Sequence, residues 1–202
     1  TSLCGTIKEI LAEPDDLSPA VINDIRSSNG VIQRRVEGLL DFSETYRTLT
    51  RSPPPNFQLV ERDELRKDAA HLWRKEAEER GSELILHLPP SPLPLQGDPH
   101  LLEQVLINLV KNAMDATTGI AQAQVHLHLN RGNEGRALIQ VADNGQGMTR
   151  EQLDQIFVPF FTTKDHGSGI GLSLSRQIMR LHKGSIEVQS VEGEGTVMSL
   201  LF

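Results

Sequence analysis

Three consecutive prolines, at positions 53–55, divide this 202-residue chain into two parts. A proline inside a helix removes a backbone hydrogen bond and clashes with the preceding turn, so no helix can pass through three of them. The apolar residues follow different patterns on the two sides of this break. We therefore expect a helical segment over residues 1–52 and a separate domain over residues 53–202.

Before the prolines, apolar residues recur at alternating spacings of three and four. This seam runs from Ile22 to Tyr46, with polar interruptions at Asn29 and Ser43, and such a heptad pattern is typical of a helix that packs along another helix. A shorter apolar stripe lies over residues 3–11. Together they predict a partial helical hairpin whose longer arm packs against another chain; the alternative is that this arm packs on its own domain.

After the prolines, strand-like and helix-like stretches alternate along the chain. The predicted strands cover residues 57–60, 83–88, 124–129, 137–142, 185–190 and 196–201. The predicted helices cover residues 63–80, 99–118 (after an Asp98 cap) and 172–182. Because strands and helices interleave while the final pair of strands forms a hairpin, we expect an α+β two-layer sandwich, a mixed sheet with its helices on one face.

The composition excludes several classes of protein. The formal net charge of −7 argues against nucleic acid or anionic lipid as the main partner. The single cysteine, Cys4, excludes a disulfide framework and fits a reducing compartment. No apolar run reaches the roughly 18 residues of a membrane span. We therefore expect a cytoplasmic location and no direct membrane contact for this fragment, with a membrane anchor elsewhere in the parent protein left open.

The predicted helix over 99–118 carries a polar face opposite its apolar one. Asn108 and Asn112 lie one turn apart, with Asp115 beside them. Asparagine is a poor helix former, so two on one face suggest a function. Amide oxygens are hard ligands of the kind that Mg²⁺ accepts together with phosphates and water. The alternative is an ordinary solvated face.

Two glycine-containing stretches follow. The first places Asp143, Gly145 and Gly147 at the end of a predicted strand, where a carboxylate can accept from an exocyclic amine and glycines allow close approach to a flat ring; its alternative is an Asn-Gly hairpin turn. The second, over 167–171, opens a predicted helix, and backbone N–H groups at such a start favour phosphate. Its alternative is a loop that merely caps the helix.

Between the glycine stretches, Phe157, Phe160 and Phe161 cluster in a chain with only 4% aromatic residues. They suggest a hinge packed on the core, or an ordinary hydrophobic anchor for a loop. Lys164 follows this cluster and is thereby placed near the second glycine stretch, where an ammonium group suits phosphate.

These motifs, in this order, resemble the N, G1, F and G2 boxes of the GHKL (Bergerat-type) ATP-binding superfamily. The similarity is greatest to the catalytic domain of sensor histidine kinases, particularly nitrogen-regulation-like sensors, and it covers roughly residues 57–202. The residues before Pro53 resemble more loosely the dimerisation and phosphoacceptor hairpin of the same kinases. The resemblance implies ATP and Mg²⁺ as ligands, a two-component signalling role, a response regulator as partner and homodimerisation through the complete hairpin.

The resemblance also implies roles for individual residues. Asn112 would coordinate Mg²⁺, and Asn108 would contact phosphate or the metal; with Lys164, a candidate γ-phosphate ligand, they form the expected catalytic set. Asp143 would bind the adenine amine, supported by Thr196, and glycines 145 and 147 would border the purine. The remaining expected nucleotide contacts are Asp115, Gly167, Ser168, Gly169, Ile170, Gly171 and Leu172.

Position 108 separates two kinds of chemistry within the superfamily. ATP-hydrolysing relatives carry a glutamate there that activates water, whereas the amide of Asn108 cannot act as a general base. The resemblance therefore implies phosphoryl transfer to a histidine, then to a response regulator aspartate. A degenerate scaffold or dimerisation module and a GHKL ATPase remain the alternatives.

None of the seven histidines precedes an acidic residue or lies before Pro53, unlike the phosphoacceptor of such kinases. We therefore expect that histidine to lie upstream of Thr1, and the fragment to bind ATP without phosphorylating itself. His126 and His128 share one face of a predicted strand. No third ligand is apparent from the sequence, so we predict no metal site there.

Overall fold

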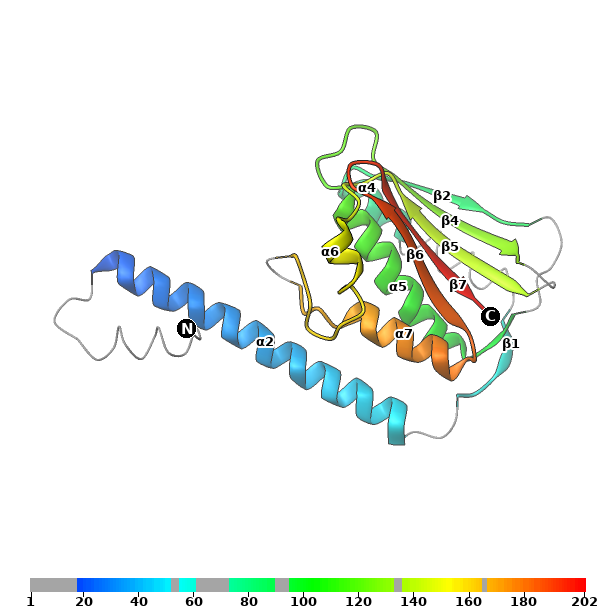
Figure 1. The fold of residues 1–202 in the computed structure, drawn as a ribbon, viewed down its shortest axis with the longest axis horizontal. Helices are drawn as coiled ribbons and strands as arrows, with labels where there is room; N and C mark the ends of the chain where they lie inside the picture. Colours follow the sequence, from blue (N-terminus) through cyan, green and yellow to red (C-terminus); the bar gives the residue numbers. More distant parts are fainter. Residues whose placement is uncertain (1–17, 52–54, 61–72, 90–94, 133–135, 165–166) are drawn as a thin grey trace.

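The computed structural model describes residues 18–51, 55–60, 73–89, 95–132, 136–164 and 167–202 (Figure 1). A long first helix, α2 (Pro19–Arg51), extends beside an α+β body and lies next to helix α7 (Gly171–Leu181). Ser18 caps α2 by accepting from the Val21 N–H at 3.4 Å. The predicted shorter arm of the hairpin, over 3–11, lies outside the described residues.

The seam of α2 is only partly covered in this single chain. The side chains of Ile22 and Val36 are 43% and 49% exposed. No described helix is long and apolar enough to cross a membrane. The division of the chain at the prolines and the pairing of α2 with another chain stay predictions.

The body is a five-stranded mixed sheet with helices on one face, as predicted. The strand order is β2 (Glu83–His87), β4 (Gln124–Arg131), β5 (Ala137–Asp143), β7 (Gly195–Leu201) and β6 (Ser185–Val191). Only β2 and β4 run parallel; every other pair is antiparallel. Figure 1 shows α5 (Pro99–Ala116) and α7 side by side against one face of this sheet.

The core lies between α5, α7, α4 (Arg74–Glu79) and the sheet. Along β4, buried residues alternate with half-buried ones, so one face of the strand packs inward and the other stays open. The apolar face of α5 is buried as predicted, through Leu102, Val105, Leu106, Leu109, Val110 and Ala113. This burial turns the opposite, polar face of α5 outward, towards the loops that follow β5.

The start of α5 is tied to distant parts of the chain. The Asp98 side chain caps the helix by accepting from the N–H groups of His100 and Leu101 at 3.1 and 3.3 Å, which confirms the predicted cap. The Asp98 N–H donates to Nε2 of the buried His182 at 2.9 Å, and Nδ1 of His182 lies 2.8 Å from the Ile178 carbonyl. This histidine therefore has a structural role: it ties the start of α5 to the end of α7.

Two short elements were not predicted. β3 (Leu95–Gly97) pairs with β1 (Gln58–Val60) in a separate antiparallel ribbon, and α6 (Arg150–Leu153) begins at a capping box made by Thr149 and Gln152. The predicted helix over 63–80 is described only over α4.

The parallel pairing of β2 and β4 corrects one prediction. His87 lies opposite His128 in the register, and its ring stacks on that of His128 with 4.1 Å between ring centroids. The expectation that His126 and His128 lack a third histidine is therefore wrong. Sequence spacing within one strand cannot reveal a neighbour that comes from another strand.

Candidate functional site

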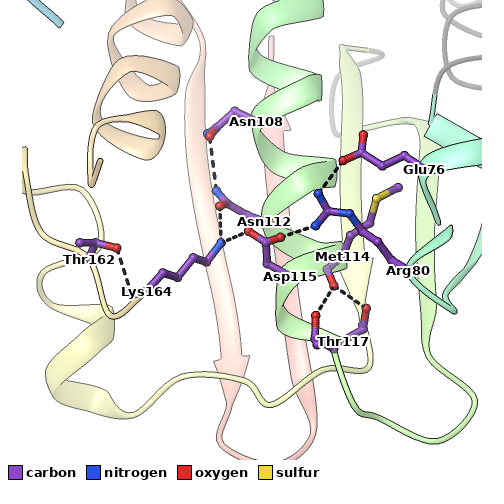
Figure 2. A network of polar contacts seen from close by, with 10 residues as sticks. Glu76, Arg80, Asn108, Asn112, Met114, Asp115, Thr117, Thr162 and Lys164 are labelled. Atoms are coloured by element: carbon purple, nitrogen blue, oxygen red, sulfur yellow. Dashed lines mark hydrogen bonds and ion pairs between the residues drawn. The ribbon is translucent and has the colours of Figure 1, made fainter. Parts of the chain in front are cut away.

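The polar face of α5 is organised by a line of hydrogen bonds (Figure 2). Asn112 donates through Nδ2 to Oδ1 of Asn108 at 3.5 Å. Asn108 in turn donates through Nδ2 to Oγ of Ser175 on α7 at 3.0 Å. Gly171 begins α7 directly against this line: a Cβ added there would lie 2.0 Å from Oδ1 of Asn108. The glycine therefore lets the start of α7 approach the two amides.

Lys164 reaches the same face from the loop between α6 and α7. Its Nζ donates to Oδ1 of Asn112 at 2.9 Å and to Oδ2 of Asp115 at 2.7 Å. Oγ1 of Thr162 accepts from the Lys164 backbone N–H at 3.1 Å and helps to shape this loop. A positive charge is thus held between one amide oxygen and one carboxylate, the hard donor types that also suit Mg²⁺.

Arg80, at the end of α4, completes this network and was missed by the sequence analysis. Its guanidinium binds the Asp115 carboxylate and, at 2.6 Å, Glu76. Burial acts to raise the pKa of Asp115, but the bonds and charges of Lys164 and Arg80 together hold that pKa below its ordinary value. Asp115 is therefore ionised at neutral pH, between two cations.

A second group of polar residues lies where β5 ends beside the start of β7. Asp143 pairs with Thr196 in the sheet register and accepts from the Gly145 N–H at 2.9 Å. Burial raises the pKa of Asp143 to about 6, although the backbone N–H groups of Gly145 and Thr196 and the charge of Lys164 act in the opposite direction. The Thr196 hydroxyl lies 2.9 Å from Oγ of Ser190, so it supports the strand pair rather than bonding Asp143 directly.

Glycines in this group are required by close backbone contacts. A Cβ at Gly145 would lie 2.5 Å from the Ala116 carbonyl oxygen, and one at Gly147 would lie 2.0 Å from that of Val191. Gly195 has φ of +120°, and a Cβ there would lie 2.0 Å from the Asp143 carbonyl oxygen. The alternative interpretation of an Asn-Gly hairpin is wrong, because β5 pairs with β4 and β7 and the chain continues past Gly145 to α6.

The second glycine stretch packs against the phenylalanine loop. Gly169 has φ of +70°, its carbonyl accepts from the Phe160 N–H at 2.8 Å, and a Cβ would lie 2.5 Å from the Phe160 carbonyl carbon. Gly167 packs against Thr162 in the same way. These contacts hold the loop that carries Lys164 against the start of α7.

The side chains around this stretch divide by burial. Ile170 is buried, so its contact with a ligand must come from the backbone. Leu172 is half-buried and packs on the core, and Ser168 is exposed. Phe157 packs on the core with the Arg176 guanidinium 5.2 Å from its ring centroid, whereas Phe160 is 39% exposed. The predicted packing of the loop on the core thus rests on Phe157.

The expected site residues therefore form two groups. Asn108, Asn112, Asp115, Lys164 and Gly171 contact one another directly, while Asp143, Gly145, Gly195 and Thr196 cluster at the ends of β5 and β7, within reach of the Lys164 charge. Ser175 was not predicted, because its burial and its contact with Asn108 depend on how α7 packs against α5. A depression lined by Glu78, Ser82, Glu83 and Gln124 shares no residue with either group.

This arrangement has a clear chemical capacity. Asn112 and Asp115 supply hard oxygen donors, and Lys164 supplies a long, flexible cationic side chain. Asp143 adds a partly buried carboxylate that accepts hydrogen bonds. The first N–H groups of α7 have no partner within the helix and are also available. Such a set suits a ligand with a hydrogen-bond-donating ring at one end and an anion with its counter-cation at the other. No described residue pairs a nucleophilic side chain with a base here.

The sequence is similar to that of known ATPases and kinases. A family model for the histidine kinase-, DNA gyrase B- and HSP90-like ATPases matches residues 97–202. The sensor histidine kinase ZraS of Klebsiella oxytoca is 34% identical over 151 residues, covering 75% of this chain and 32% of that protein. The histidine-protein kinase AtoS of Escherichia coli (strain K12) is 32% identical over 181 residues, covering 90% and 28% respectively. The chain thus spans about a third of the length of these relatives.

Solved structures give the same result for the fold. The catalytic domain of the histidine kinase ThkA superposes with a TM-score of 0.65 at 28% identity, covering 73% of this chain and 95% of that one. Full-length ShkA in complex with AMPPNP superposes with a TM-score of 0.69 at 23% identity, covering 90% and 37%. The α+β two-layer architecture is therefore that of histidine kinase catalytic domains.

Proposed function

The chain belongs to the histidine kinase-, DNA gyrase B- and HSP90-like ATPase family, among the sensor histidine kinases, and on this premise we propose that it binds Mg-ATP and presents the γ-phosphoryl group to a histidine. The observation that carries the proposal is the side chain at position 108. Asn108 lies on the polar face of α5 and is engaged by Ser175 and Asn112. An amide held in this way can position a phosphate but cannot deprotonate water.

We assign the base of the nucleotide to the group around Asp143. Its carboxylate lies at the end of β5 and accepts hydrogen bonds, so it can accept from the adenine amino group. The close approach of the backbone at Gly145 and Gly147 leaves no side chain between that carboxylate and a flat ring. The structure of ShkA was determined with AMPPNP, an ATP analogue, which supports a nucleotide as the ligand.

We assign the phosphates to the other group. Asn112 and its neighbour Asp115 would hold Mg²⁺, since both already direct an oxygen at the Lys164 ammonium. When bound, the metal supplies charge neutralisation for the phosphate oxygens. Asn108 and the backbone at 167–172 would orient the phosphates, and Lys164 would meet the γ-phosphate. The site would thereby hold the terminal phosphorus in line for a nucleophile that none of the described residues provides there.

The proposed reaction is phosphoryl transfer to an imidazole. The lone pair of a neutral ring nitrogen attacks the γ-phosphorus, an N–P bond forms, the bond to the bridging oxygen breaks and ADP leaves. In the parent protein we propose that the phosphoryl group then passes to an aspartate of a response regulator, and that α2 contributes to a homodimer through the completed hairpin.

The test is to follow labelled ATP with the purified chain, alone and with an intact phosphoacceptor hairpin supplied in trans. We expect bound ATP with negligible hydrolysis, and label on the hairpin histidine when the hairpin is present. Steady hydrolysis by the chain alone would instead identify an ATPase. Failure to bind ATP would identify a scaffold module that has kept the fold.

A further inference from the structure

We propose that His87, His126 and His128 form a binding site for a divalent transition-metal ion of the Zn²⁺ type on the open face of the sheet. This site is independent of the nucleotide residues, because the sheet separates it from α5 and α7. The three histidines come from two neighbouring strands, β2 and β4, and their ligand nitrogens all lie within 4.8 Å of one another.

The strand register creates the cluster. His126 and His128 are two residues apart on β4, so their side chains leave the same face of the sheet. The parallel neighbour β2 places His87 opposite His128 and Ile85 opposite His126. In both strands the intervening residues, such as Leu127, point into the core. The three imidazoles are thus fixed to one patch by the backbone.

The distances suit a metal with few adjustments. Tetrahedral coordination with Zn–N bonds of about 2.0–2.1 Å places ligand nitrogens roughly 3.3–3.4 Å apart. Nε2 of His87 and Nδ1 of His126 already lie 3.0 Å apart, and all the ligand nitrogens of the cluster lie within 4.8 Å of one another. The three rings lie stacked, with interplanar angles of 4°, 14° and 15°. Binding therefore requires them to rotate until one nitrogen of each points at a common centre, and His87 is exposed while the other two are half-buried.

The surroundings favour a borderline metal over a hard one. The neighbours of the cluster on β5 are Ala142 and Gln140. Among the described residues no carboxylate belongs to the cluster, and that of Glu83, further along β2, accepts from Gln124 at 3.1 Å. Three imidazoles without a carboxylate suit Zn²⁺, Ni²⁺ or Cu²⁺ and discriminate against Mg²⁺. With three protein ligands, a fourth position stays open to water.

The experiment is a calorimetric titration of the chain with Zn²⁺ alone, without nucleotide, repeated for His87→Asn, His126→Asn and His128→Asn. We expect one ion per chain for the parent. Loss of groups that merely orient a metal ligand costs roughly 10–100-fold in affinity, so removing a ligand should cost at least about 100-fold. The matched control is His100→Asn, an exposed histidine on α5 outside the cluster, which should bind like the parent.

A second measurement does not depend on the variants. The ring nitrogen resonances of the parent should shift on addition of Zn²⁺ for these three histidines and stay unchanged for the buried His182. Absence of saturable Zn²⁺ binding by the parent would overturn the proposal. So would binding that the three variants retain, or resonance shifts confined to other histidines.

Discussion

The two ends of the candidate site are built in different ways. At the carboxylate end (Asp143, Gly145, Gly195 and Thr196), position is set by strand register and by backbone contacts too close for a side chain. At the amide end (Asn108, Asn112, Asp115 and Lys164), position is set by side chains that reach one another from α5, α7, α4 and a loop.

This difference separates stability from ligand binding. A larger side chain at the carboxylate end must displace packed backbone, and this lowers the free energy of unfolding. A substitution at the amide end moves partly exposed side chains and should leave the fold nearly unchanged while it alters affinity. The following experiments test this division, beginning with the largest expected effect.

Gly195→Ala should destabilise the chain by about 2–4 kcal/mol. Its φ of +120° disfavours any side chain, and the new Cβ would meet the Asp143 carbonyl oxygen at 2.0 Å. The measurement is the free energy of unfolding in urea.

The matched control is Gly193→Ala in the same turn. Gly193 also has a positive φ, +82°, but nothing lies within 4 Å of a Cβ there, so only the cost of the conformation remains, about 1 kcal/mol. Equal losses of unfolding free energy in Gly195→Ala and Gly193→Ala would mean that close backbone contacts do not determine the position of the carboxylate end.

Gly171→Ala should reduce ATP affinity by about tenfold, the equivalent of one hydrogen bond to a charged group, with a change in unfolding free energy of no more than about 0.5 kcal/mol. The added methyl displaces the Asn108 side chain, while alanine suits the first turn of a helix. Calorimetric titration and urea unfolding check the two parts. A large loss of stability with unchanged affinity would contradict the assignment of this glycine to the amide end.

Nucleotide affinity should fall as the pH drops through about 6. The pKa of Asp143 in the free protein lies above its ordinary value of 3.8, at about 6, mainly through burial, so below that pH the carboxyl is protonated and loses its charge as an acceptor. Affinity should then fall by up to about tenfold per pH unit.

Asp143→Asn provides the baseline for this profile, since ATP itself takes up a proton in the same range. The ratio of parent to variant affinity, measured between pH 5 and pH 8, therefore reports only the contribution of the Asp143 carboxyl group to the pH dependence. A ratio that is independent of pH would show that Asp143 does not contact the nucleotide in its ionised form.

The smallest effect should come from Lys164→Ala. Its ion pair with Asp115 is partly exposed, so the loss of stability should stay within about 1 kcal/mol. If Lys164 meets the γ-phosphate, the variant should lose a few-fold in affinity for ATP and nothing for ADP. The control is Lys111→Ala, an exposed lysine on α5, the helix that carries Asp115. Equal losses of affinity for ATP and ADP would show that Lys164 does not contact the γ-phosphate.

The sequence was sufficient for most of the fold because its signals were local. The helical spacing of apolar residues and the Asp98 cap predicted α5 and its two faces, and strand-like apolar stretches predicted the strands of the sheet. α6 was not predicted, although a local signal for its start is present in the sequence, the capping box of Thr149 and Gln152. β3 had none, since it is three residues long and depends on pairing with β1 far away along the chain.

The site was predictable only as far as residue types within a motif suggest contacts. Asn108 and Asn112 share a helix, so their proximity follows from the helical repeat. Arg80 and Ser175 join them from other elements, and His87 joins His126 and His128 through the register of β2. Contacts of this kind depend on tertiary packing, which single-sequence patterns do not encode.

The central claim is that the carboxylate end and the amide end of the site bind a single Mg-ATP together. The most direct measurement is calorimetric titration with ATP, with and without Mg²⁺, of the parent, Asp143→Ala and Asn112→Ala. We predict one magnesium-dependent site in the parent, binding weakened in Asp143→Ala, and loss of the magnesium dependence in Asn112→Ala. No saturable binding by the parent, or identical titrations for all three proteins, would contradict the account.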